Sequence, residues 1–545
     1  MLLALFLAFL TLRLFTSVPF RLPADSLKFL ELAKNFPYHT LYNSQVYLQH
    51  PPVYPYLLHF FNLILSKDYI AGIFMSLLFA SLTFYVLYRF LMLITADFSL
   101  SFTLLLLFSL SVELIDSSHR ATRESLMILL LFSSIYFYIK SVRLKSSSSM
   151  VLASLSGAMT ALTTDHVIFL FPAFGLSYLF FNKEKLRFKN FRFPGLMIAL
   201  VPVLITLLAY GSWLGARAYV YSGNEFYPAG LEGTPVRVNN FGLFELINPT
   251  YFGDYEENVG VQHDFVSRLK NYAYNLGYML NIEPFSIPRG LNFSTASYLL
   301  LPKHVLYMIV VYFPLAIIAV YGFFSIVKDS IKKRKLHTNA ALFSIALLLI
   351  FMFPITQRVT SPRYLYPAYP FLFFVISYGV IKIGKLGFIQ KNENRIPHII
   401  VFLLLILIPA WLINNHNFVL FNEKVVVANK TADFIIKKIP PGDSIMAQPG
   451  YGAAITYLTD NKVIGLPPKP DSMLFFIKHY NIKYAVFGRF FTYENYHYSV
   501  ESVDFIKKNP DKFQLIASIK EDYGNLFSEK DNTRTDEVYI YRVKD

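Results

Sequence analysis

The sequence contains no cysteine among its 545 residues, and this absence excludes several kinds of site. Disulfide frameworks, thiolate nucleophiles and cysteine-ligated zinc all require that side chain. Any metal would therefore need histidine or carboxylate ligands. Charged residues are also scarce, at 16%, whereas 54% of the residues are hydrophobic. Soluble domains carry about 25% charged residues, so the composition favours a membrane protein.

The formal net charge of +15 does not by itself indicate a nucleic-acid partner. The basic residues gather in short segments between apolar runs, at Arg143 and Lys145 and within residues 183–192, 328–335 and 382–395. Short basic loops of this kind lie on the cytoplasmic side of a membrane. We therefore interpret the positive charge as a signal of membrane orientation and expect no nucleic acid.

Apolar runs long enough to cross a bilayer recur through the first 415 residues and predict about eleven transmembrane helices with the N-terminus inside. The run at residues 2–20 lacks a basic leader and a clear cleavage site, so we interpret it as a retained span. The predicted spans are residues 2–20, 69–91, 98–114, 124–140, a pair within 150–182, 194–213, 302–325, 338–356, 364–384 and 397–414. An odd number of crossings within 150–182 remains the alternative.

This topology divides the chain into two parts. Residues 1–415 form a predicted transmembrane domain with outer loops at 21–68 and 214–301. Residues 416–545 form a predicted extracytoplasmic α/β domain, because short strand-like runs alternate there with helical stretches. In the first outer loop, Phe29 and Ala33 fall on one helical face and Glu31 on another, which predicts a helix lying in the membrane interface.

Three groups of residues resemble motifs of one superfamily. An acidic residue opens the first outer loop in Pro23, Ala24, Asp25 and Ser26, and residues 50–58 then read HPPVYPYLL. Residues 118–126 read SHRATRESL, and residues 362–367 read PRYLYP before a late span. In this order the motifs resemble the GT-C superfamily of membrane glycosyltransferases, closest to its protein O-mannosyltransferase and aminoarabinose-transferase-like branch.

The chain departs from that superfamily at two points. Family members commonly carry Asp-Glu at the first-loop acid, whereas Ser26 follows Asp25 here. The Trp-Trp-Asp signature of oligosaccharyltransferase catalytic subunits is also absent, because the only tryptophans are Trp213 and Trp411. Transfer of a large glycan en bloc to asparagine is therefore disfavoured.

The resemblance implies an enzyme that moves a mannose-like sugar, or another hexose or pentose, from a polyprenyl-phosphate carrier such as dolichyl phosphate. The acceptor would be a hydroxyl of a protein, lipid or glycan on the outer side, and the transfer would invert the anomeric carbon. No cofactor is required by the residues, and a divalent metal is allowed. The protein would be a multi-pass component of the cell membrane, or of the ER membrane in a eukaryote.

The reaction needs a carboxylate base near the acceptor and a cation near the departing phosphate. The resemblance points to Asp25 as the base and to Arg363 as the phosphate ligand, with Tyr364 as a hydrogen-bonding neighbour and Arg358 as a helper. Asp25 has an alternative role as an acid at a helix N-terminus. The alternative role of Arg363 is that of an interfacial side chain that snorkels to lipid headgroups.

Other polar residues are candidates for contact with the substrate. Arg120 and Glu124 lie beside a span, where a local ion pair explains them as well as a binding role does. His50 precedes two prolines that would shape the return of the loop to the membrane. Asp165 and His166, at the predicted outer tip of 150–182, would bind substrate or a metal, with structural capping as the alternative.

Two other function classes remain open from the sequence. A transporter or flippase of lipid-linked sugars would show repeated halves and binding groups at the bilayer midplane. No repeat is visible, and the polar residues concentrate in the outer loops. A non-catalytic scaffold would act through the C-terminal domain alone, which expression of that domain from about Val425 would test.

Overall fold

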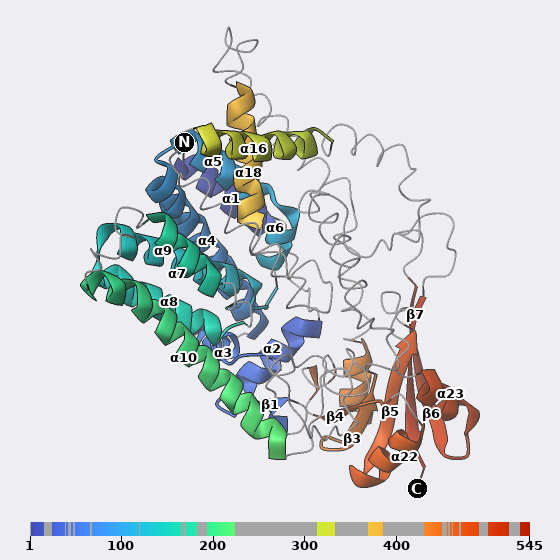
Figure 1. Cartoon of the computed structure of the whole chain (residues 1–545). Helices are drawn as coiled ribbons and strands as arrows, with labels where there is room; N and C mark the ends of the chain where they lie inside the picture. Colours follow the sequence, from blue (N-terminus) through green and yellow to red (C-terminus); the bar gives the residue numbers. More distant parts are fainter. Residues whose placement is uncertain are drawn as a thin grey trace.

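A computed structural model describes most of the membrane helices and most of the C-terminal part of the chain (Figure 1). The described residues are 2–15, 24–38, 40–41, 45–46, 50–65, 68–118, 120–164, 167, 170–181, 193–223, 313–332, 369–384, 430–448, 455, 458–459, 461–467, 470–489, 500–522 and 535–544. The helices that precede residue 223 gather on one side of the molecule, and the strands of the C-terminal part lie on the other.

Within the described residues, three helices are long and apolar enough to cross a membrane. They lie in α4 (Asp68–Thr95), α7 (Glu124–Leu144) and α10 (Phe193–Gly223). The shorter helices α1 (Leu2–Phe15), α5 (Phe98–Leu110) and α18 (Tyr369–Gly384) fall within further predicted spans and are also apolar. The chain is therefore an integral membrane protein.

The total of about eleven crossings stays a prediction. Predicted spans 338–356 and 397–414 lie outside the described residues. The predicted pair within 150–182 corresponds to α8 (Ser147–Ala161) and α9 (Leu170–Phe181). Each is shorter than the roughly 20 residues that a crossing needs, so the double crossing stays a prediction.

The α7 helix lies at the centre of the bundle. Its membrane segment is 83% buried, whereas that of α10 is 28% buried. The α7 helix packs against α4, α8 and α9, while α10 leaves large side chains such as Leu204 and Leu208 exposed, as expected of a lipid-facing surface. The N-terminus of α7 is thereby placed at the centre of one end of the bundle.

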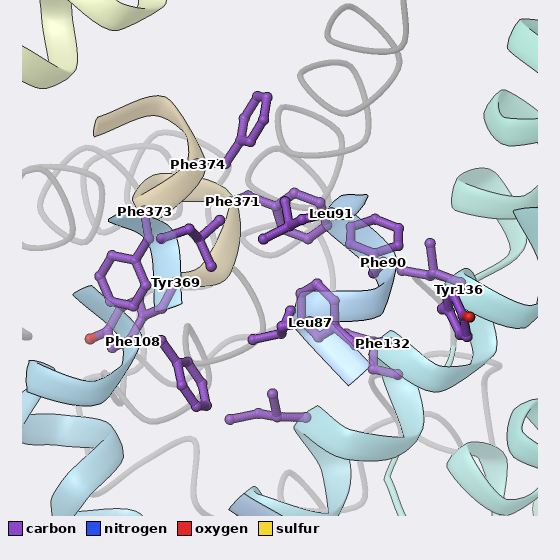
Figure 2. Close-up of a cluster of buried hydrophobic side chains, with 14 of the residues drawn as sticks. Leu87, Phe90, Leu91, Phe108, Phe132, Tyr136, Tyr369, Phe371, Phe373 and Phe374 are labelled. Carbon is purple, nitrogen blue, oxygen red and sulfur yellow. The ribbon is translucent and has the colours of Figure 1, made fainter. Parts of the chain in front are cut away.

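An aromatic layer fixes α18 against the helices that precede it in sequence. Figure 2 shows side chains of α4, α5, α7 and α18 gathered in one apolar cluster. Within this layer the ring centroids of Phe132 and Phe371 lie 5.3 Å apart. Tyr369, the first residue of α18, is buried at 1% exposure. The start of α18, which follows the predicted Arg363 segment by a few residues, is thus held firmly in the bundle.

The α16 helix (Phe313–Lys332) crosses α18 at a point where two glycines meet (Figure 1). A Cβ atom on Gly322 would lie 2.2 Å from the carbonyl oxygen of Val375, and one on Gly379 would lie 2.3 Å from that of Ile318. Nearby, Asp329 pairs with Lys382 at 2.5 Å and accepts a hydrogen bond from the Tyr378 hydroxyl. Close backbone approach at small residues is a common basis of helix association in membranes.

Gly322→Ala is therefore expected to destabilise the protein, because the new methyl group meets backbone rather than a flexible side chain. Overpacking of this kind costs about 1–3 kcal/mol. Thermal unfolding in detergent measures the effect. Gly175→Ala is the matched control, since its Cβ would meet nothing within 4 Å. Equal unfolding temperatures for the two variants would contradict the close crossing.

The C-terminal part contains a five-stranded mixed sheet in the order β4-β3-β5-β7-β6. Its strands are β3 (Ser444–Ala447), β4 (Lys462–Gly465), β5 (Ile482–Arg489), β6 (Phe513–Asp522) and β7 (Thr535–Val543). The β3 strand runs parallel to β4 and β5, whereas β7 is antiparallel to β5 and β6. A helix covers residues 430–438, and α22 (Pro470–His479) and α23 (Val500–Lys508) follow.

The two faces of this sheet belong to different apolar clusters. Met446 and Phe487 pack with Phe476 of α22 and Ile506 of α23. The opposite face, including Val486 and Ile540, belongs to one cluster with side chains of the helices near the N-terminus. That this part is an independent domain outside the cytoplasm remains a prediction.

The first outer loop contains more regular structure than the sequence indicated. Residues 24–34 form α2 (Ala24–Lys34), and the apolar helix α3 (Val53–Leu65) follows the short strands β1 (Thr40–Leu41) and β2 (Gln45–Val46). The face of α2 that carries Glu31 is not left open at that residue, because Glu31 is 5% exposed and Leu30 and Leu32 are fully buried. The reason is that α3 and α4 pack against α2, whose buried side chains share a cluster with the C-terminal sheet.

Candidate functional site

Two predicted outer segments meet where α3 begins. The backbone N–H of Val53 donates to the carbonyl of Leu162, at the end of α8, over 3.0 Å. The two prolines after His50 directly precede α3, as expected of residues that turn the chain back into a helix. This hydrogen bond joins the segment that carries His50 to the segment that leads to Asp165 and His166.

The turn between α6 (Val112–Ser118) and α7 is held by two other helices. Ser76 of α4 donates its hydroxyl to the carbonyl of Arg120 over 2.6 Å. Arg123 donates to the carbonyl of Thr163 over 3.5 Å, which ties the same turn to the end of α8. Residues 120–123 of the predicted motif therefore form a fixed turn at the centre of the bundle end.

A glycine permits α4 to lie against this turn. A Cβ atom on Gly72 would lie 2.3 Å from the Cβ of Ala121 and 3.2 Å from its Cα. No larger side chain fits at position 72 unless the helix or the turn moves. Position 72 thus sets the separation between α4 and the residues that follow Ser118.

Beside the turn lies a group of polar side chains that we call the polar junction: Tyr54, Ser76, Arg120, Arg123 and Glu124. Tyr54 is fully buried, and its hydroxyl lies beside the Ser76 hydroxyl and the Glu124 carboxylate. One carboxylate oxygen of Glu124 is buried and accepts no hydrogen bond within the part of the chain that the structure describes. The junction therefore combines cations, a carboxylate and hydroxyls at one end of an apolar bundle.

The α2 helix connects to the polar junction through Phe29. The Phe29 ring stacks on the His50 ring, with centroids 5.0 Å apart, and meets the Tyr54 ring edge-on at 4.9 Å. Asp25 is the second residue of α2, one helical turn before Phe29. Because residues four apart share a helix face, position 25 is on the face of α2 that carries Phe29. The structure thereby brings His50, Arg120 and Glu124 into one region and places α2 beside it.

The remaining predicted site residues are not described. Arg358, Arg363, Tyr364, Asp165 and His166 lie outside the described residues. Their roles, like those of the described candidates, stay predictions. Within the described ranges, no three histidine or acidic side chains form a group that could hold a metal ion. The sequence-based expectation, that a divalent metal is allowed but not required, therefore stays a prediction.

Several polar residues of the bundle were missed from the sequence. Tyr54 and Ser76 belong to the polar junction, and Arg13 and Arg217 are buried arginines at 1% and 0% exposure. The Arg217 guanidinium lies 5.0 Å from the Trp213 ring centroid. An arginine within an apolar run is itself a signal, because a charge there must pair or line a polar cavity.

Comparison with solved structures identifies the fold. The structure of ArnT from Cupriavidus metallidurans bound to undecaprenyl phosphate superposes with a TM-score of 0.53 at 12% identity, over 99% of this chain and 97% of ArnT. The chain has the GT-C fold. The predicted resemblance is confirmed at this level.

Two further matches agree with the GT-C fold. The apo oligosaccharyltransferase of Archaeoglobus fulgidus superposes with a TM-score of 0.54 at 11% identity, over 89% of this chain and 69% of that protein. The family described as dolichyl-phosphate-mannose-protein mannosyltransferase matches residues 49–213. That match begins beside His50 and includes the whole polar junction. No curated protein shows significant sequence similarity to the chain.

Proposed function

We propose that this GT-C protein transfers a single sugar from a polyprenyl-phosphate carrier to an acceptor hydroxyl. One observation carries the proposal: α2, which bears Asp25, packs through Phe29 against His50 and Tyr54 at the edge of the polar junction. The likeness to ArnT, solved with undecaprenyl phosphate bound, and the match to a dolichyl-phosphate-mannose-dependent family support the class of donor.

In the proposed reaction the acceptor oxygen attacks the anomeric carbon as the bond from that carbon to the carrier phosphate breaks. The phosphate oxygen keeps the electron pair, and Asp25 takes the acceptor proton. A direct displacement from the opposite face inverts the anomeric carbon. A positioned general base contributes about 10²–10⁴-fold to such a step.

The departing phosphate gains negative charge, so cations near it stabilise the transition state. Arg363 is the proposed phosphate ligand, because a planar guanidinium binds phosphate through two parallel hydrogen bonds. Tyr364 would donate a further hydrogen bond, and Arg358 would add charge. His50, Arg120 and Glu124 are proposed to contact the sugar or its phosphate from the polar junction.

The location and the acceptor are part of the same proposal. We assign the reaction to the outer side of the membrane, with the unit 416–545 on that side, because the short basic loops are assigned to the cytoplasm. The acceptor hydroxyl would belong to a protein, a lipid or a glycan. The prenyl chain would lie between membrane helices.

The test uses detergent-purified full-length protein and a small panel of polyprenyl-phosphate sugars with candidate acceptors. We expect polyprenyl phosphate to be released with at least one donor, and the product to have the opposite anomeric configuration. Release without acceptor consumption, or a product with retained configuration, would overturn the proposed mechanism. Binding of every donor without any release would instead support transport.

A further inference from the structure

We propose that Arg13, a buried arginine of α1, is a positioning residue that fixes the start of the segment leading into the polar junction. Arg13 is 1% exposed although it lies within an apolar run. A charged side chain in the hydrocarbon region is costly unless it is paired or hydrogen-bonded, so its retention there needs a structural or functional reason. Its function in the reaction rests on the proposed glycosyl transfer.

The Arg13 guanidinium joins three parts of the bundle. Its Nε donates to the Ser118 hydroxyl over 3.0 Å, and its Nη1 and Nη2 donate to the carbonyls of Ser109 and Phe108 over 3.2 and 3.5 Å. The carbonyls belong to the last turn of α5, where the helix leaves such groups without an intrahelical partner. Arg13 thus caps α5 and holds the end of α6 at the same time.

Two aromatic rings also contact the Arg13 guanidinium and restrict its orientation. The Arg13 Cζ lies 3.8 Å from the Phe9 ring centroid and 5.7 Å from that of Phe108. The Phe9 and Phe108 rings themselves stack with centroids 6.1 Å apart. Lysine could supply the charge at this position, but its single ammonium cannot reproduce the fork of donors.

The connection to the polar junction runs through Ser118 and the turn that follows it. Ser118 donates its hydroxyl to the Leu114 carbonyl over 2.7 Å while it accepts from Arg13. Two residues later, the Arg120 carbonyl accepts from Ser76. The turn is thereby held by α1 on one side and by α4 on the other, and Arg13 supplies the first of these two supports.

Arg13 acts on the reaction through this turn. Loss of its hydrogen bonds is expected to lower turnover more than it weakens donor binding. A misplacement of about 1 Å can cost about 10²-fold in rate. We expect Arg13→Gln to lower kcat by about 10- to 100-fold, with a smaller change in KM. Ser118→Ala should lower kcat less, and Arg13→Lys should retain only part of the wild-type kcat. The double variant should be no slower than Arg13→Gln alone, because both changes remove the same link.

Thr83→Ala is the matched control for Ser118→Ala. Thr83 is also buried, and its hydroxyl donates to the Phe79 carbonyl of its own helix over 2.7 Å. Its removal should leave kcat unchanged. Multiplicative effects of Arg13→Gln and Ser118→Ala in the double variant, or full activity of Arg13→Gln, would overturn the proposal.

The absence of native cysteine gives a readout that does not depend on activity. Thr122 is 3% exposed in the turn, so a maleimide should label the Thr122→Cys variant slowly. Added Arg13→Gln should speed that labelling about 10-fold, while labelling of Ser502→Cys, a buried position in α23, stays unchanged. Equal acceleration at both positions, or none at position 122, would overturn the positioning role even if the protein had no transferase activity.

Discussion

Asp25→Asn is expected to lower the rate of polyprenyl phosphate release by about 10²–10⁴-fold while donor binding persists. Asparagine keeps the shape of the side chain but cannot accept the acceptor proton at neutral pH. The proposed leaving-group contacts are made by other residues, so the donor should still bind. Single-turnover release and equilibrium donor binding, measured on the same preparation, separate the two effects.

The control must address the alternative that Asp25 merely stabilises the start of α2. Asp97 serves this purpose, because its carboxylate caps α5 by accepting from the Leu100 N–H over 3.0 Å. Asparagine caps helices about as well as aspartate, so Asp97→Asn should retain full turnover. If Asp25→Asn also retained full turnover, Asp25 would be only an acid at the helix start.

Gly72→Ala is expected to reduce turnover strongly, because the new methyl group would lie 2.3 Å from the Ala121 Cβ. Both α4 and the turn are firmly packed, so one of them must shift, at a cost of about 1–3 kcal/mol. A shift of the turn displaces Arg120 and Glu124, and a 1 Å displacement costs about 10²-fold in rate. Steady-state kinetics and thermal unfolding would be measured together.

Two further variants test whether the contact with Ala121 causes the loss of turnover. Gly211→Ala adds the same methyl group to a helix where nothing lies within 4 Å, so it should leave turnover unchanged. Ala121→Gly removes the atom that Gly72→Ala would meet, and the double variant should recover much of the lost turnover. A double variant as slow as Gly72→Ala would show that the contact at Ala121 is not the cause.

Much of the helical architecture was predicted from the long apolar runs. The apolar runs at residues 69–91, 124–140 and 194–213 each coincide with a long helix. The strand-like runs at residues 444–447 and 537–542 fall within β3 and β7. The strand β4, Lys462–Gly465, was not predicted from the sequence. The motif order also predicted the GT-C fold, which the comparisons confirm.

The site was harder to predict because its geometry depends on contacts between distant segments. The pattern of α2 placed Glu31 on a different face from Phe29 and Ala33, but burial of α2 from several sides is a tertiary effect that periodicity cannot show. Likewise, nothing in the order of residues indicated that Phe29 joins His50 to Tyr54, or that Ser76 holds Arg120. The sequence predicted residue types for the chemistry, and the packing of α2, α3 and α4 determined which of them meet.

The most direct test of the central claim is a parallel measurement of polyprenyl phosphate released and sugar transferred by purified wild-type protein and by Asp25→Asn. We predict equal molar amounts of both products for the wild type, and a collapse of both for the variant. Donor binding by the wild type with neither product, for any donor and acceptor of the panel, would contradict the assignment of a transferase.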